Sequence, residues 1–181
     1  GRIQRLINAA KATIEGIEIE TKINLTDQFS IEGSLGYTDA GFDEFLGFDA
    51  DGIRGYDPVT DPAAAAALKF ERVPELTYNI MANYFQPLSN GAELDFRISY
   101  SYTDDFTNDA LGTRAIITDS YGLLDASVSY TFAGSGLKLT VFGKNITDED
   151  YHDFALDNAL TSLTWGGVPD TYGLRLTYSF E

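Results

Sequence analysis

The chain has 181 residues, of which 28 are Asp or Glu and 12 are Lys or Arg, so its formal net charge is −16. This charge repels nucleic-acid phosphates and disfavours nucleic acid as a partner. The absence of cysteine excludes disulfides and thiolate metal sites, and a single histidine excludes a multi-histidine zinc site.

Apolar and polar residues alternate with a period of two along most of the chain, which predicts β-strands. In the first strand Ile17, Ile19 and Ile23 fall on one face, and Glu18 and Glu20 fall on the other. The abundance of Tyr, Phe and Gly favours the same secondary structure. In chain order, we predict seven strands, over residues 13–25, 29–37, 76–84, 94–102, 124–132, 137–141 and 172–180.

The connections between these strands alternate in length. Short turns near residues 26–28, 87–91 and 133–136 alternate with long loops over about 43–72, 103–119 and 146–170. Sequential antiparallel strands with this alternation form an up-and-down meander, with all short turns at one end and all long loops at the other. Outer-membrane β-barrels have this asymmetry. The longest purely apolar run, Ala63–Leu68, is too short to cross a membrane as a helix.

Alternation also fits a soluble, lipocalin-like barrel whose apolar face points inward. Charges in the middle of strands, such as Asp95, Arg97 and Arg175, favour a wet lumen instead, and aromatic residues near strand ends resemble membrane girdles. We therefore expect the apolar face to contact lipid. The residues assigned to lipid are Ile17, Ile19, Ile31, Leu35, Ile80, Phe96, Ile98, Val128, Leu139 and Leu174.

The strand number suggests a part of a larger barrel. Seven is odd, whereas bacterial single-chain barrels have even numbers of strands. A complete barrel of about eight strands needs a further strand from residues 1–7. The simpler interpretation is an all-β fold, namely an antiparallel up-and-down transmembrane β-barrel segment of about seven strands that forms the C-terminal part of a larger barrel.

Four stretches resemble a known family, the TonB-dependent outer-membrane receptors. They are NAAKATIEGIEIE (Asn8–Glu20), LGYTDAGFDEF (Leu35–Phe45), VFGKNITDEDY (Val141–Tyr151) and PDTYGLRLTYSF (Pro169–Phe180). The third is similar to the family's Gly-Lys-Asn-Leu-Thr-Asp signature and the fourth to its closing strand. Two positions depart from the pattern: Asp170 stands where the family commonly has Arg, and Glu181 follows the final aromatic residue.

The resemblance implies a barrel of about 22 strands whose lumen is filled by an N-terminal plug domain. It also implies capture of an extracellular small-molecule ligand, a ferric siderophore or similar scarce nutrient, and import energised by the TonB complex of the inner membrane. Residues 1–181 then form the C-terminal segment of the barrel domain, without the plug through which TonB acts. The other implied partners are outer-membrane lipid and the barrel-assembly machinery.

Ligand contacts are expected in the three long loops, where aromatic and Arg side chains supply stacking and charge-assisted bonds to a bulky anionic chelate. The candidates are Phe45, Arg54, Tyr56, His152 and Trp165.

The closing strand is expected to carry an assembly signal. Tyr172, Leu174, Leu176, Tyr178 and Phe180 alternate on one face, and the run ends in an aromatic ring. A strand with unpaired backbone groups can template pairing with another edge. This pattern resembles the C-terminal signal that the barrel-assembly machinery reads.

The sequence predicts no catalytic site, no cofactor and no metal site. No serine has a convincing histidine base with an acid partner, and the Asp49–Gly52 run lacks the closing Glu of a calcium loop. Two other functions stay open at this stage: a complete small outer-membrane barrel with a structural or adhesion role, and a soluble barrel that binds an apolar ligand.

Overall fold

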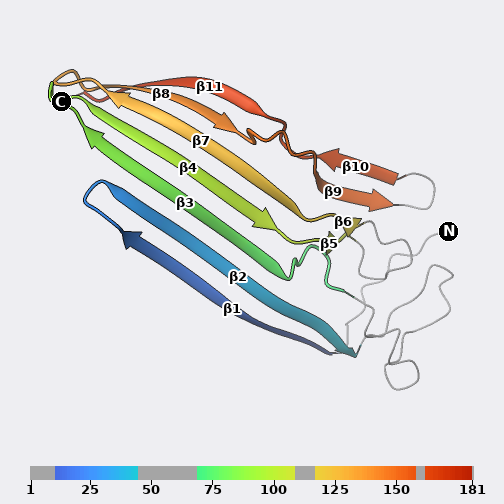
Figure 1. Cartoon of the computed structure of the whole chain (residues 1–181). Helices are drawn as coiled ribbons and strands as arrows, with labels where there is room; N and C mark the ends of the chain where they lie inside the picture. Colours follow the sequence, from blue (N-terminus) through green and yellow to red (C-terminus); the bar gives the residue numbers. More distant parts are fainter. Residues whose placement is uncertain (1–10, 45–68, 109–116, 158–161, 181) are drawn as a thin grey trace.

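The computed structural model describes residues 11–44, 69–108, 117–157 and 162–180. Seven long strands form one antiparallel sheet in the order β1-β2-β3-β4-β7-β8-β11 (Figure 1). The predicted all-β, up-and-down meander is therefore confirmed. The strands are β1 (Lys11–Asn24), β2 (Phe29–Glu44), β3 (Leu76–Pro87), β4 (Glu93–Thr103), β7 (Tyr121–Thr131), β8 (Leu137–Lys144) and β11 (Thr171–Tyr178).

The two ends of the sheet differ as the connection lengths predict. The short turns β1–β2, β3–β4 and β7–β8 lie together at one end, here called the turn end, and the long connections lie at the other, the loop end (Figure 1). The turns use residues suited to tight reversal. The Thr26 hydroxyl accepts hydrogen bonds from the backbone of Gln28 and Phe29, and Gly134 and Gly136 take positive φ angles of 61° and 65°.

The first long loop begins close to its predicted start near Asp43, because the second strand runs to Glu44. The third loop, predicted over about 146–170, contains a hairpin that the sequence analysis did not predict, formed by β9 (His152–Asp157) and β10 (Ser162–Gly166). The second loop holds the short pair β5 (Phe106–Thr107) and β6 (Ile117–Thr118). These strands are too short for alternation to reveal them.

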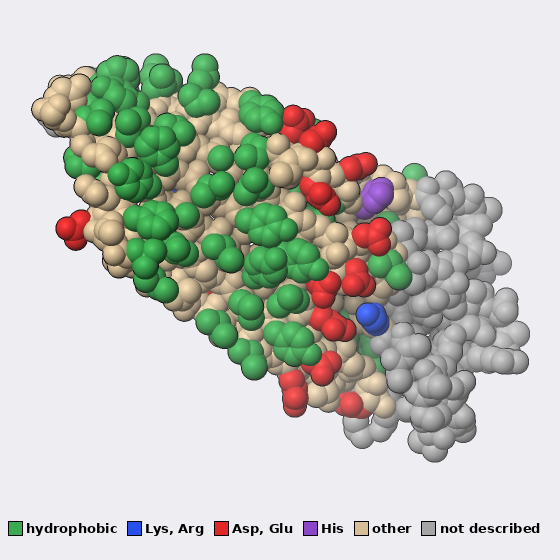
Figure 2. Space-filling view, in the orientation of Figure 1, with side chains coloured by type: hydrophobic (Ala, Val, Ile, Leu, Met, Phe, Trp, Pro, Cys, Tyr) green, Lys and Arg blue, Asp and Glu red, His purple; other side chains and the backbone are tan. Residues whose placement is uncertain are grey.

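The register places the predicted apolar side chains on one face. Ile19 lies opposite Leu35, Ile80 opposite Tyr100, and Phe96 opposite Val128. Because paired residues of adjacent strands point to the same side, the whole apolar set shares this face. Figure 2 shows the face densely covered by hydrophobic side chains, with acidic side chains bordering it toward the loop end.

The sheet is a single layer, so few of its described side chains are buried. Among the described residues only Ala92, Phe106 and Ala155 are buried hydrophobic residues, whereas Ile98 and Leu174 are 47% and 74% exposed. A continuous exposed apolar face of this extent marks a surface that contacts something other than water. In the described part of the chain, no helix is long and apolar enough to cross a membrane.

The sheet is open within the described residues. β1 and β11 are its two edge strands, and neither pairs with the other. An unpaired edge in lipid leaves backbone donors and acceptors unsatisfied, at a cost of several kcal/mol per group. Further strands are therefore needed to close a barrel around this segment.

Candidate functional site

The face opposite the apolar one is polar and hollowed. A cavity of about 750 Å³ lies over it, toward the turn end, and its lining includes residues from all seven long strands. Strand parity explains this, because each strand directs its alternate, polar residues to this side. One lining residue from each strand in sheet order is Lys22, Glu32, Asn83, Arg97, Ser129, Thr140 and Arg175.

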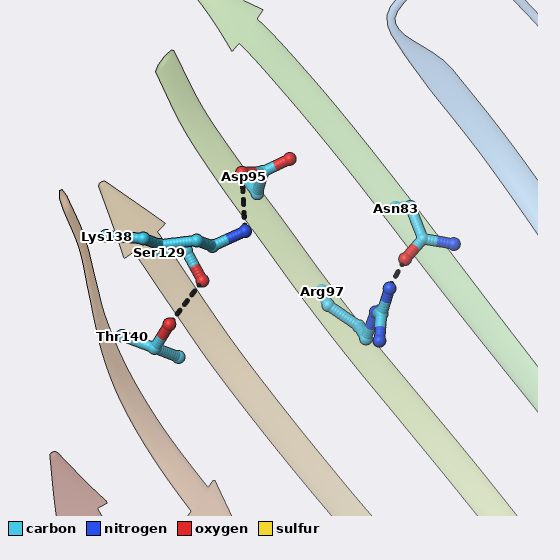
Figure 3. Close-up of polar contacts among 6 residues, drawn as sticks. All are labelled: Asn83, Asp95, Arg97, Ser129, Lys138 and Thr140. Atoms are coloured by element: carbon cyan, nitrogen blue, oxygen red, sulfur yellow. Dashed lines mark hydrogen bonds and ion pairs between the residues drawn. The ribbon is translucent and has the colours of Figure 1, made fainter. Parts of the chain in front are cut away.

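Both lysines of the cavity form ion pairs. Lys22 Nζ lies 2.6 Å from Glu32 Oε1 across β1 and β2, and Lys138 Nζ lies 3.3 Å from Asp95 Oδ2 (Figure 3). All four side chains are substantially exposed to the cavity, and exposed pairs of this kind stabilise a fold by at most about 1 kcal/mol. Their main effect is to hold charged groups in place on the wall.

The two arginines have neutral partners. Arg97 Nε donates to the Asn83 amide oxygen over 2.8 Å (Figure 3), and the guanidinium carbon of Arg175 lies 5.5 Å from the centre of the Phe142 ring. Between them, the Ser129 and Thr140 hydroxyls share a hydrogen bond of 2.8 Å. The wall therefore presents hydroxyl and guanidinium groups to whatever occupies the cavity. Within the described ranges, no group of three or more Asp, Glu or His side chains could hold a metal ion.

The loop end brings together two of the five predicted ligand contacts. His152 and Trp165 lie on neighbouring strands of the β9–β10 hairpin, where His152 pairs with Gly166 and Trp165 with Phe154. The Trp165 side chain is 52% exposed, and its ring centre lies 5.2 Å from that of Phe154. The other three candidates, Phe45, Arg54 and Tyr56, lie outside the described residues. The Asp49–Gly52 run lies outside them as well.

Sequence reasoning missed Arg72 and Phe154, which belong to this cluster. Arg72 lies with its guanidinium carbon 5.5 Å from the centre of the Phe154 ring, and its Nη2 donates to the Asp153 carbonyl oxygen over 3.3 Å. Arg72 thus joins the first long connection to the third. Nothing in the local pattern indicates this contact, because the partners are separated by about 80 positions in the chain.

Asn145 fixes the base of the third connection. Its side-chain nitrogen donates to the carbonyl oxygens of Glu149 and Val168 over 2.9 and 3.1 Å, and its side-chain oxygen accepts from the Glu149 backbone over 2.9 Å. The residue is buried and has a φ of 48°, a left-handed conformation that Asn tolerates better than most residues. This accounts physically for the Asn in the Gly-Lys-Asn signature.

The residues of the expected assembly signal occupy the sheet edge. Tyr172, Leu174 and Leu176 lie on the apolar face of β11, opposite Gly143, Val141 and Leu139 of β8. Beyond the strand, Phe180 is 89% exposed, and its ring packs edge-on against Tyr178 with the ring centres 4.7 Å apart. Within the described chain, β11 is thus an edge strand with one unpaired side, and the assembly signal stays a prediction.

An antiparallel meander with an apolar outer face, a polar hollowed face and long connections at one end defines the class of outer-membrane β-barrels. Residues 1–146 match the family model described as "TonB dependent receptor-like, beta-barrel". The chain belongs to this family of TonB-dependent receptors. Its members are receptors and transporters of the bacterial outer membrane, so the chain is part of an outer-membrane barrel.

Solved structures share the fold. The ferric yersiniabactin uptake receptor of Yersinia pestis aligns with 96% of the chain at a TM-score of 0.74 and 18% identity. The siderophore receptor PiuA of Acinetobacter baumannii aligns with 91% at a TM-score of 0.70 and 16% identity. The ferric-catecholate import receptor Fiu of E. coli K12 aligns with 91% at 0.65 and 18%. The chain spans only 24%, 21% and 20% of these proteins, respectively.

Proposed function

We propose that the chain is the C-terminal segment of the barrel of a receptor that imports a ferric siderophore or a chemically similar scarce nutrient. The observation that carries this proposal is the match to the receptor family together with a polar cavity that extends over every long strand of the sheet. Structural neighbours named as siderophore receptors support the ligand class. The closing-strand motif Pro169–Phe180 supports the position in the barrel.

The plug domain of this receptor lies outside residues 1–181 and fills the lumen against the polar face. Energy from the inner-membrane TonB complex reaches the ligand through that domain, and the barrel wall holds it in place. The hydroxyl, amide and ion-paired side chains of the cavity suit contact with a folded polar surface, because each can exchange a bond to water for a bond to protein.

The ligand binds at the loop end. Trp165, Phe154 and Arg72 offer two exposed or partly exposed rings and a guanidinium within one cluster, which is the chemistry needed to stack on and neutralise an anionic aromatic chelate. His152 lies next to this cluster on β9. Phe45, Arg54 and Tyr56 of the first connection remain predicted contacts.

The test is uptake by the full-length receptor in a strain that lacks it. We expect growth under iron limitation with at least one ferric siderophore from a panel of catecholate, hydroxamate and mixed-type chelates. Trp165→Ala is expected to raise the apparent Kd for that chelate, whereas Tyr84→Ala, an aromatic truncation on the apolar face, is expected to leave it unchanged. Deletion of residues 49–61 should also weaken binding. No uptake of any chelate by a correctly inserted receptor contradicts the proposal.

A further inference from the structure

The cavity wall at the turn end has a charge composition opposite to that of the chain. Among the described residues, four Lys or Arg and three Asp or Glu line it, whereas the chain as a whole has 12 of the first and 28 of the second. The cations are Lys22, Arg97, Lys138 and Arg175, and the carboxylates are Asp27, Glu32 and Asp95. A wall that is locally cationic in a chain of net charge −16 indicates a specific electrostatic environment on this side of the sheet.

The surplus positive charge belongs to the arginines. Glu32 and Asp95 each pair with a lysine, and Asp125, diagonal to Arg97 on β7, accepts the backbone N–H of Asn145 over 2.9 Å. Asp27 lies in the β1–β2 turn and forms no ion pair with the described cations. Among the residues the structure describes, neither Arg97 nor Arg175 has a carboxylate partner. Figure 3 shows Arg97 directed to Asn83 while Asp95 is directed to Lys138.

Whether these guanidinium groups need a charged partner depends on whether water reaches them. In an aqueous lumen they are solvated and need no partner. Once a protein domain covers the wall, water is displaced, and an unpaired buried charge is strongly destabilising. Among protein side chains, carboxylates both neutralise a guanidinium group and accept its N–H groups in a bidentate arrangement, so they are the most favourable buried partners.

We propose that the plug surface facing β4 to β11 carries carboxylates that pair with Arg97 and Arg175, so that an acidic patch on the plug docks on a cationic patch of the barrel wall. This inference rests on the proposed receptor function and names the chemistry of the plug at this wall. The cationic patch is defined here by Arg97 and Arg175. The Ser129 and Thr140 hydroxyls lie between them and bond to each other, so only one of their two O–H groups can donate to a further acceptor.

Arg97 is the better test position, because it distinguishes a carboxylate in the lumen from one on a further barrel strand. It lies in β4, whose neighbours β3 and β7 both belong to the described chain, and its register partners are Asn83 and Ser127. A carboxylate from outside residues 1–181 can therefore reach it only from within the lumen. Arg175 lies on the edge strand β11, where a further barrel strand could also supply an acid.

The experiment uses zero-length carbodiimide coupling, which joins an amine only to a carboxylate in direct contact. Arg97→Lys and Arg175→Lys are made separately in the full-length receptor, coupled in isolated outer membranes, and analysed by mass spectrometry of the digested protein. The native pair Lys138–Asp95, 3.3 Å apart, is the internal positive control in every sample. Arg97→Gln, which has no amine, is the matched negative control.

We expect Arg97→Lys to give a new cross-link to an Asp or Glu outside residues 1–181, in a yield comparable to that of Lys138–Asp95. The proposal is overturned if the Arg97→Lys side chain couples only to Asp95 or Asp125, or to nothing, while the Lys138–Asp95 link forms. Either result would show that Arg97 faces water or mobile anions in place of an acidic plug surface.

Uptake by the same variants separates the two proposals. A receptor that carries Arg97→Lys, supports growth on its ferric siderophore and gives no cross-link outside residues 1–181 refutes the acidic plug surface alone. A wild-type receptor that transports no chelate, yet gives the expected cross-link in the Arg97→Lys form, refutes the transport function and leaves the docking chemistry in place.

Discussion

Asn145 donates its backbone N–H to the Asp125 carboxylate over 2.9 Å, which ties the end of β8 to the polar face of β7. The Asn145 side chain then holds both ends of the connection that carries the β9–β10 hairpin, through Glu149 and Val168. One residue at the rim of the barrel wall thus links the membrane sheet to the candidate ligand-binding hairpin.

Asn145→Ala is expected to destabilise the folded receptor by about 2–4 kcal/mol, because it removes three side-chain hydrogen bonds and places alanine in a left-handed backbone conformation. Urea unfolding of the receptor in lipid bilayers measures the change. Asn145→Gly is the matched control, since glycine accepts the backbone angle but lacks the side chain. Equal stability of the Ala variant and wild type would show that these bonds do not support the rim.

The two faces of β4 should respond very differently to a charge. Ile98→Arg places a guanidinium on the apolar face, near the middle of the strand, and should cost about 2–4 kcal/mol in a bilayer. Ser99→Arg, one residue along, places the same group on the polar face, opposite Asp125, and should cost much less. Unfolding free energies of both variants in the same lipid provide the comparison. Equal costs would contradict the assignment of the faces.

Phe142 covers Gly173 across β8 and β11, and a Cβ atom added at Gly173 would lie 2.5 Å from the Phe142 ring. We expect Gly173→Ala to cost about 1–3 kcal/mol through overpacking. In a Phe142→Leu background the cost should be smaller, which a double-mutant cycle measures. Gly41→Ala is the control, because Gly41 lies in β2 with open space at the same position. Additive effects of the two substitutions would show that the contact is not restrictive.

Phe180→Ala tests the predicted assembly signal. If the assembly machinery reads the terminal ring, the folded, heat-modifiable fraction of the full-length receptor in the outer membrane should fall. Phe132→Ala removes another exposed aromatic side chain near the turn end and is the matched control. The prediction requires a larger loss for Phe180→Ala. Wild-type amounts of folded receptor would instead make Phe180 an interfacial residue without a role in assembly.

Strand alternation is a local property, and it was sufficient to assign the seven long strands and the two faces of the sheet. Ile17 and Ile19 favour an apolar environment, whereas Glu18 and Glu20 favour a polar one. Because successive side chains of a strand point to opposite faces, a strand places each pair in the environment that it favours. The alternation of short and long connections likewise predicted the up-and-down order of the strands. The Gly-Lys-Asn stretch and the closing strand pointed to the receptor family, which the match over residues 1–146 bears out.

Only the tertiary structure decided which polar groups meet. That Asp95 pairs with Lys138 and leaves Arg97 to Asn83 depends on the register of β3, β4, β7 and β8, which alternation does not specify beyond the choice of face. The same holds for Arg72 over Phe154, because contacts between long connections depend on how the strands below them are arranged in space. The sequence by itself determined the faces of the wall, and the folded sheet determined which of its charges have no counter-charge among the described residues.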